Sequence, residues 1–259
     1  MSTKKESVLR TLTVALLVCL VCSVVVSAAA VALKPVQVTN QLQDKQRNIL
    51  QIAGLYKEGV SVQDQFKQIT PRLVDLRTGE FSDARDPLTF DQQKASKDPA
   101  TSERLDPEAD IASIRRQSYY STVYVVEDEQ GEIETLILPI HGYGLWSTLY
   151  GFMALESDLK TVVGLGFYQH AETPGLGGEV DNPNWKKQWT GKVVYDESGD
   201  VDISVIKGGV DSNSPNAEHQ VDALTGATLT SRGVENLVRF WLGQDGFGEF
   251  LDHLRAGEA

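Results

Sequence analysis

The segment Asp222-Ala-Leu-Thr-Gly-Ala-Thr-Leu-Thr-Ser231 lies between a β-rich region and a strongly periodic helix. Its residues are mostly small, so backbone amides and hydroxyls lie uncovered. The apolar residues after it have the spacing of a helix packed on a core, and they are Val234, Leu237, Val238, Trp241 and Leu242. The segment therefore predicts a phosphate site at a helix start or, alternatively, an ordinary N-cap that satisfies its own backbone.

Length and charge limit the fold and the partners. A chain of 259 residues has room for one sizeable domain with an appendage, or for two small domains. The formal net charge of −12 argues against nucleic acid as a partner. Successive strand patterns with helices at the ends predict an α+β fold, with a mostly antiparallel sheet flanked by helices.

Residues 11–33 contain no charged side chain and are long enough to cross a bilayer, which takes about 20 residues. A cleaved signal peptide is the alternative, but its apolar region is usually about 7–15 residues. We therefore expect a single transmembrane anchor at 11–33, a cytoplasmic tail at 1–10 and an extracytoplasmic remainder. Cys19 and Cys22 both lie inside the span, and two ligands do not complete a metal site, so we expect no metal and no disulfide.

Residues 34–110 connect the anchor to the C-terminal domain. Amphipathic helices are expected there at 41–53 and 61–69, and Ser61 with Asp64 should form a capping box at the start of the second helix. A hairpin is expected at 72–81, and the acidic segment 82–110 should be a long loop or a partly disordered insertion. The domain at 111–259 should contain strands at 122–126, 132–140, 149–155, 161–169, 192–195 and 201–206, the last two paired, and helices starting near 180, 230 and 246.

Three further stretches carry ligand-binding signals. The segment 172–179 has three glycines and a proline, which predicts a tight loop that a ligand can approach. Trp146, which follows the predicted strand 132–140, would stack on a planar ligand or serve as a core tryptophan. Lys207 precedes two glycines and would pair with an anion or remain solvated.

Asp222, Thr225, Gly226, Ala227 and Thr228 resemble the flavinylation motif of the FMN-binding domains in the Na+-translocating NADH:quinone reductase and the related Rnf electron-transport complex. The segments 172–177 and 142–146 are similar to the family's E-T-P-G-L-G and G-x-G-L-W segments. The resemblance covers about 122–242. The chain resembles the NqrC family of the reductase more closely than the shorter Rnf counterpart, because the segment between its membrane span and its flavin domain is long.

The resemblance implies that a dedicated flavin transferase joins FMN, through its phosphate, to the hydroxyl of Thr228. It implies that Thr225 bonds the phosphate and that Asp222 positions a group of the transferase. The remaining expected flavin contacts are Leu145, Trp146, Glu172, Thr173, Gly175, Leu176, Gly177, Lys207, Gly226 and Ala227. No residue is expected to be catalytic.

By the same resemblance, the chain would be an electron-transfer subunit in the bacterial inner membrane, with its C-terminal domain in the periplasm. Other membrane subunits of the complex would be its partners, and sodium movement would belong to the assembly. The alternatives are an Rnf-type subunit, an anchored module that binds a ligand non-covalently, and a free-standing flavin reductase. A free-standing flavin reductase needs a pyridine-nucleotide site, and the glycines at 175–178 lack the G-x-G-x-x-G spacing of such a site.

Overall fold

The computed structural model describes residues 8–258, so residues 1–7 of the expected cytoplasmic tail lie outside the described part. The chain divides into two compact units, Met1–Lys45 and Gln46–Ala259. Helix α1 (Val8–Ile52) contains the expected anchor, and among the described residues it is the helix long and apolar enough to cross a membrane. The helix expected at 41–53 is a continuation of α1, because Pro35 is accommodated within it instead of ending it.

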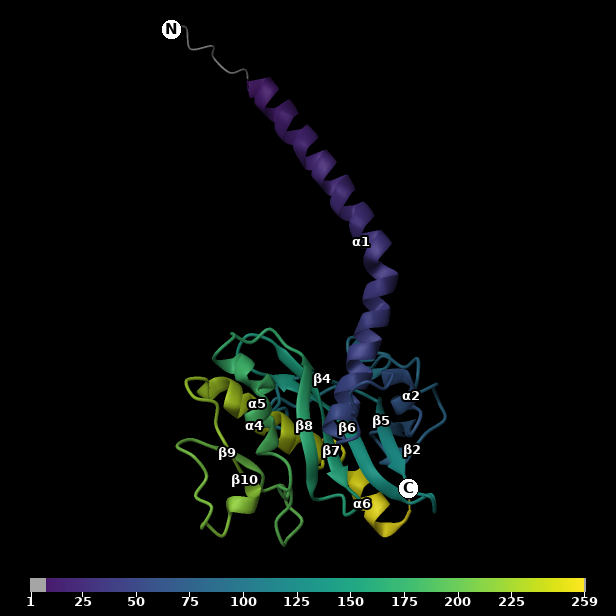
Figure 1. Ribbon diagram of the computed structural model, residues 1–259, viewed down its shortest axis with the longest axis vertical. Helices are drawn as coiled ribbons and strands as arrows, with labels where there is room; N and C mark the ends of the chain where they lie inside the picture. Colours follow the sequence, from purple (N-terminus) through teal and green to yellow (C-terminus); the bar gives the residue numbers. More distant parts are fainter. Residues whose placement is uncertain (1–7, 259) are drawn as a thin grey trace. The chain divides into compact units, whose positions relative to one another are not determined.

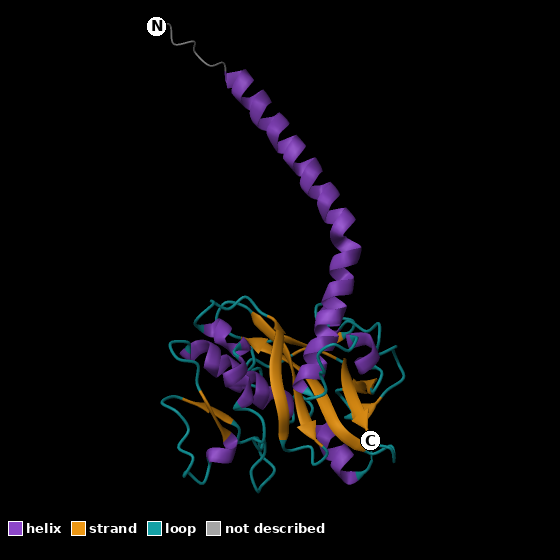
Figure 2. Cartoon of the chain, in the orientation of Figure 1, coloured by secondary structure: helices purple, strands orange, loops and turns teal. Residues whose placement is uncertain are grey.

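The C-terminal unit is built on a six-stranded sheet, in the order β2-β1-β5-β6-β7-β8 (Figure 2). Every neighbouring pair in it is antiparallel, which confirms the predicted sheet type. The strands are β1 (Ile69–Asp75), β2 (Glu80–Phe81), β5 (Tyr120–Glu127), β6 (Ile133–Tyr143), β7 (Thr148–Glu156) and β8 (Val162–Gln169). Two short ladders lie outside it: β3 (Ser102–Arg104) with β4 (Arg116–Ser118), and β9 (Ser204–Ile206) with β10 (Gln220–Asp222).

Both faces of the sheet are covered, as alternation along β6 illustrates. Leu136 and Leu138 are buried in the larger core with α5 (Thr228–Leu242) and α6 (Gly248–Ala256), the yellow helices of Figure 1. Ile137, between them, is buried in the smaller core with Leu50. A strand presents successive side chains to opposite faces, so a central strand covered on both sides becomes a continuous apolar run.

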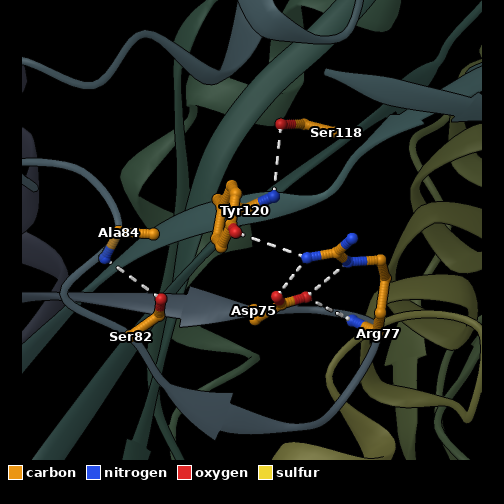
Figure 3. Close-up of polar contacts among 6 residues, drawn as sticks. All are labelled: Asp75, Arg77, Ser82, Ala84, Ser118 and Tyr120. Atoms are coloured by element: carbon orange, nitrogen blue, oxygen red, sulfur yellow. Dashed lines mark hydrogen bonds and ion pairs between the residues drawn. The ribbon is translucent and has the colours of Figure 1, made fainter. Parts of the chain in front are cut away.

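The hairpin expected at 72–81 is confirmed as β1 and β2, and a local ion pair holds its turn (Figure 3). Arg77 pairs with Asp75 through both carboxylate oxygens and also donates to the hydroxyl of Tyr120 at 3.3 Å. The hydrogen bond from Arg77 keeps the pKa of Asp75 below its ordinary value, although partial burial opposes the shift.

Three local expectations need correction. Helix α2 (Val62–Phe66) is shorter than expected, and Ser61 makes no capping bond with its side chain, so no capping box forms. The segment 82–110 is mainly loop, but it contains β3 and the short helix α3 (Gln92–Ala95). Its order comes from contacts with β5, where Ser121 Oγ donates to Gln92 Oε1 at 3.0 Å.

The hairpin predicted from 192–195 and 201–206 is wrong beyond a single bridge, Tyr195 to Val201. The carbonyl of Val194 accepts from both Asp202 and Ile203, so the two segments lose their register. Strand β9 pairs instead with β10, in parallel. Because β10 ends at Asp222, this ladder leads directly into the small-residue segment. The remaining helices are α4 (Pro183–Lys187) and two 3₁₀ turns, Gly177–Asp181 and Ala217–His219.

Candidate functional site

Three segments far apart in the sequence meet at one buried carboxylate, that of Glu172, which follows β8. Its Oε1 accepts from the backbone amides of the β6–β7 turn, namely Leu145 at 3.1 Å, Trp146 at 3.0 Å and Ser147 at 3.2 Å. Its Oε2 accepts from the hydroxyl of Thr230, in the first turn of α5, at 2.8 Å. Glu172 is only 5% exposed, so it lies under the loops that the sequence predicted to surround a ligand.

Burial favours the neutral form of Glu172, but the hydrogen bonds from Trp146, Thr230, Leu145 and Ser147 outweigh it and hold the pKa of this carboxyl below its ordinary value. The site therefore contains a permanent negative charge at neutral pH. That charge lies at the start of α5, where the helix dipole favours an anion.

Glycines allow the three segments to approach so closely. A Cβ on Gly144 would lie 2.7 Å from Glu172 Oε1, and a Cβ on Gly177 would lie 2.5 Å from Thr230 Oγ1 and 2.7 Å from Glu172 Oε2. Both contacts are closer than a side chain tolerates. Thr230 and Gly144 were not among the expected site residues, because no periodicity or motif marks a partner of a buried carboxylate.

Helix α5 begins at Thr228, and its N-cap residue, Ala227, makes no capping bond with its side chain. Ser231 holds the turn from inside: its Oγ accepts from Leu224 N at 2.9 Å and donates to Ala227 O at 3.0 Å. Thr225 and Thr228 are exposed. The alternative of an ordinary N-cap is therefore wrong, because the side chain of Ala227 does not cap α5.

A pocket of about 730 Å³ opens beside this turn. Thr225, Gly226 and Thr228 line it together with Lys207, so the structure brings the expected lysine to the expected threonines. Arg232 lines it too, and sequence reasoning missed this residue. Arg232 follows Thr228 by four positions, which places both on one face of the helix, with Cβ atoms about 6 Å apart.

Asp222 connects the segment to its surroundings. Its Oδ1 accepts from Val210 N at 2.6 Å, and its carbonyl accepts from the indole of Trp185 at 2.7 Å. The first bond fixes the 207–210 loop, and with it the position of Lys207, against the end of β10.

Exposed apolar side chains lie on the three segments that meet at Glu172. Trp146 is 67% exposed, whereas the other tryptophans are buried, so the interpretation of Trp146 as a core residue is wrong. Leu145, Leu176 and Leu229 are also exposed. Leu176 reaches the motif, since a Cβ on Gly226 would lie 3.2 Å from its Cδ2. Exposed apolar side chains gathered at one place indicate a surface that a ligand or partner covers.

The loop between β8 and α4 takes the tight form that its composition predicted. The carbonyl of Thr173 accepts from Leu176 N at 3.1 Å and Gly178 N at 2.9 Å, and Gly175 has a positive φ of 75°. Thr173 and Gly175 are exposed, whereas Gly177 is buried against Thr230. The expected residues of this loop therefore divide into an exposed rim and a buried base.

His141 is structural. Its ring stacks on Tyr150, with centroids 5.4 Å apart, and lies 4.8 Å from the ring of Trp241, whose indole N–H donates to the carbonyl of His141 at 2.6 Å. Burial lowers the pKa of His141 to about 4, so this side chain is neutral at physiological pH.

The FMN-binding domain family matches residues 144–243, a range that includes all three segments. The NqrC protein of the Na(+)-translocating NADH-quinone reductase from Pseudomonas aeruginosa is 61% identical over 259 residues, covering 98% of this chain and 99% of that protein. The chain belongs to the NqrC family. The NqrC protein of Yersinia pestis is 49% identical, covering 97% of this chain and 95% of that protein.

Solved structures of the NqrC family share the fold. Shewanella oneidensis NqrC has a TM-score of 0.76 and 37% identity, covering 83% of this chain and 98% of that chain. The Parabacteroides distasonis NqrC has a TM-score of 0.65 and 27% identity, covering 85% and 96%. NqrC membership, expected from the flavinylation motif and the long segment before the flavin domain, is thereby confirmed, and the Rnf-type alternative falls away.

Proposed function

We propose that the chain carries FMN covalently at Thr228 and relays electrons within a membrane-bound, sodium-pumping NADH:quinone oxidoreductase. The relatives named as subunits of that reductase and the match to the FMN-binding domain family support the assignment. The observation that carries the attachment site is the exposed Thr228 at the start of an uncapped helix, beside a pocket with two basic side chains.

The residues present fit the two ends of FMN. First-turn amides of α5, with Lys207 and Arg232, provide donors and positive charge for a phosphate. Thr225, exposed in the same pocket, adds a hydroxyl. Trp146 and Leu176 offer apolar contact to a flat ring, with Leu145, Thr173 and Gly175 around them. FMN supplies reversible one- and two-electron chemistry at the isoalloxazine, remote from the phosphate that tethers it.

Attachment is a phosphoryl transfer to Thr228, for which we propose a separate flavin transferase and a flavin phosphoanhydride as donor. The Oγ–P bond forms, the anhydride P–O bond breaks, the leaving phosphate departs and the hydroxyl proton passes to a base of the transferase. Gly226 and Ala227 leave the threonine accessible. Asp222 would position the transferase's metal or nucleotide, in addition to holding the 207–210 loop.

We further propose that α1 anchors the chain in the bacterial inner membrane by a single pass, with the acidic C-terminal unit in the periplasm. Other membrane subunits of the reductase would then exchange electrons with the flavin. Residues 11–33 of α1 contain no ionisable carboxylate or base, so the sodium path would belong to other subunits.

Production of the chain with and without a flavin transferase tests the proposal. The denatured wild-type band should fluoresce as a flavin only with the transferase, Thr228→Ala should be dark, and Thr228→Ser should restore the signal because it keeps a hydroxyl. A dark wild-type band beside an active transferase contradicts covalent attachment. Flavin that binds the native protein but leaves on denaturation would favour the anchored, non-covalent module.

A further inference from the structure

We infer that Glu172 is a positioning residue, which locks the Trp146 turn to the first turn of α5 and so fixes the flavin ring relative to its tether. The inference deepens the proposed function and rests on it for the flavin. It assigns Glu172 to the support of the site, whereas the resemblance alone would make this residue a flavin contact.

The carboxylate of Glu172 already accepts four hydrogen bonds from the protein itself. Three amides donate to Oε1, which has two lone pairs to share among them, and the hydroxyl of Thr230 donates to Oε2, so the carboxylate is bound to the protein on both oxygens. With 5% exposure, it also lies out of reach of a ring above the loop. Its donors come from two different elements, so its bonds tie those elements to each other.

What these bonds fix is the relative position of two residues that the flavin needs. The amide of Trp146 is held at 3.0 Å, while most of its side chain remains exposed and free to pack against a ring. On the other side, Thr230 is held at 2.8 Å and lies two residues beyond Thr228. A single side chain therefore sets the spacing between the aromatic contact and the tether.

The charge of Glu172 has a second consequence for the flavin. Its Oε atoms accept from three backbone amides and one hydroxyl, which are all neutral groups. These hydrogen-bond donors therefore add no fixed positive charge. A buried negative charge beneath a ring disfavours an added electron, so Glu172 should lower the reduction potential of the bound flavin.

The test compares Glu172→Gln, Glu172→Ala and Thr230→Val in the full-length chain. Glu179→Gln is the matched control, since this carboxylate lies in the same loop but accepts from the nearby Asn182 at 2.8 Å instead of joining two elements. Hydrogen exchange of the amides of 145–147 is measured without flavin. Flavin fluorescence lifetime and midpoint potential are measured after attachment, with and without Trp146→Phe.

In Glu172→Ala we expect exchange at 145–147 to be at least about tenfold faster, because the acceptor is gone and the turn opens locally. The flavin lifetime should lengthen as Trp146 quenching is lost, and the same change in a Trp146→Phe background should have no further effect. Thr230→Val should lengthen the lifetime in the same direction, and Glu179→Gln should match the wild type.

Glu172→Gln separates charge from shape. Its amide oxygen can still accept from the turn, so exchange should stay near wild type while the potential becomes more positive. A purely structural role for Glu172 would not produce this combination.

Unchanged exchange and lifetime in Glu172→Ala and Thr230→Val would overturn the positioning role. An unchanged potential in Glu172→Gln would overturn the electrostatic one. If Glu172→Ala fails to fold, Thr230→Val tests the positioning role and Glu172→Gln tests the electrostatic one. If the wild-type chain takes up no flavin, the proposed function fails, whereas the exchange measurements still decide whether Glu172 holds the turn.

Discussion

Replacing Gly177 with alanine would insert a methyl group between the carboxylate of Glu172 and the hydroxyl of Thr230. The new Cβ would lie 2.5 Å from Thr230 Oγ1 and 2.7 Å from Glu172 Oε2, where ordinary contacts begin near 3.4 Å. The oxygens must therefore retreat by about 0.7–0.9 Å, which breaks their mutual 2.8 Å hydrogen bond. Overpacking costs about 1–3 kcal/mol and a lost bond to a charged group costs about 1.5–3 kcal/mol.

Because the two costs overlap, we expect a loss of about 3 kcal/mol in the free energy of unfolding. For a unit of this size, that lowers Tm by about 6–12 °C. Thermal unfolding followed by circular dichroism of the full-length chain in detergent measures it. Gly178→Ala is the control, since its Cβ would lie 3.1 Å from Thr173 O and needs only a small adjustment. Equal Tm values for the two variants would refute the close contact at Gly177.

Three further outcomes follow from the same geometry. Lys207→Gln with Arg232→Gln should slow flavin attachment at least about tenfold through lost phosphate contacts, measured as in-gel fluorescence against time. Asp222→Asn should keep its bond from Val210, and hence the wild-type Tm, but lose attachment if the charge serves the transferase; normal attachment would contradict that role. The pKa of His141 is lower in the folded chain than in the unfolded chain, so acidification from pH 6.5 to about 4 should reduce the free energy of unfolding by up to about 3 kcal/mol. Thermal unfolding at a series of pH values measures this loss, and His141→Phe should remove it.

Much of the fold follows from local patterns. The hairpin of β5 and β6 and the strands β7 and β8 were predictable because each is a mostly apolar run bounded by turn residues, and the helix α5 was predictable from its helical spacing. The parallel pairing of β9 with β10 was not predictable, because the partners are separated by a loop without a periodic signal. The bonds that disrupt the expected hairpin join backbone groups, and no side chain in the sequence marks them.

The candidate site shows the same division. The small-residue motif and the glycine-rich loop identified the segments that meet, and the structure brings Lys207 to Thr228 as expected. No pattern signalled that Glu172 would be buried, because its donors come from elements more than about 20 residues away on each side. Arg232 was detectable in principle from its spacing of four from Thr228, but an arginine on an exposed helix face is usually only solvated.

The exposed Trp146, Leu176 and Leu229 have a consequence for biosynthesis. If the proposed flavin covers them, a subunit without flavin presents this apolar surface to water and is the form most prone to self-association. Attachment of the cofactor would then act as a maturation step, after which the surface is suitable for assembly with neighbouring subunits. Flavin attachment would then precede assembly of the complex, because the subunit without flavin is less soluble.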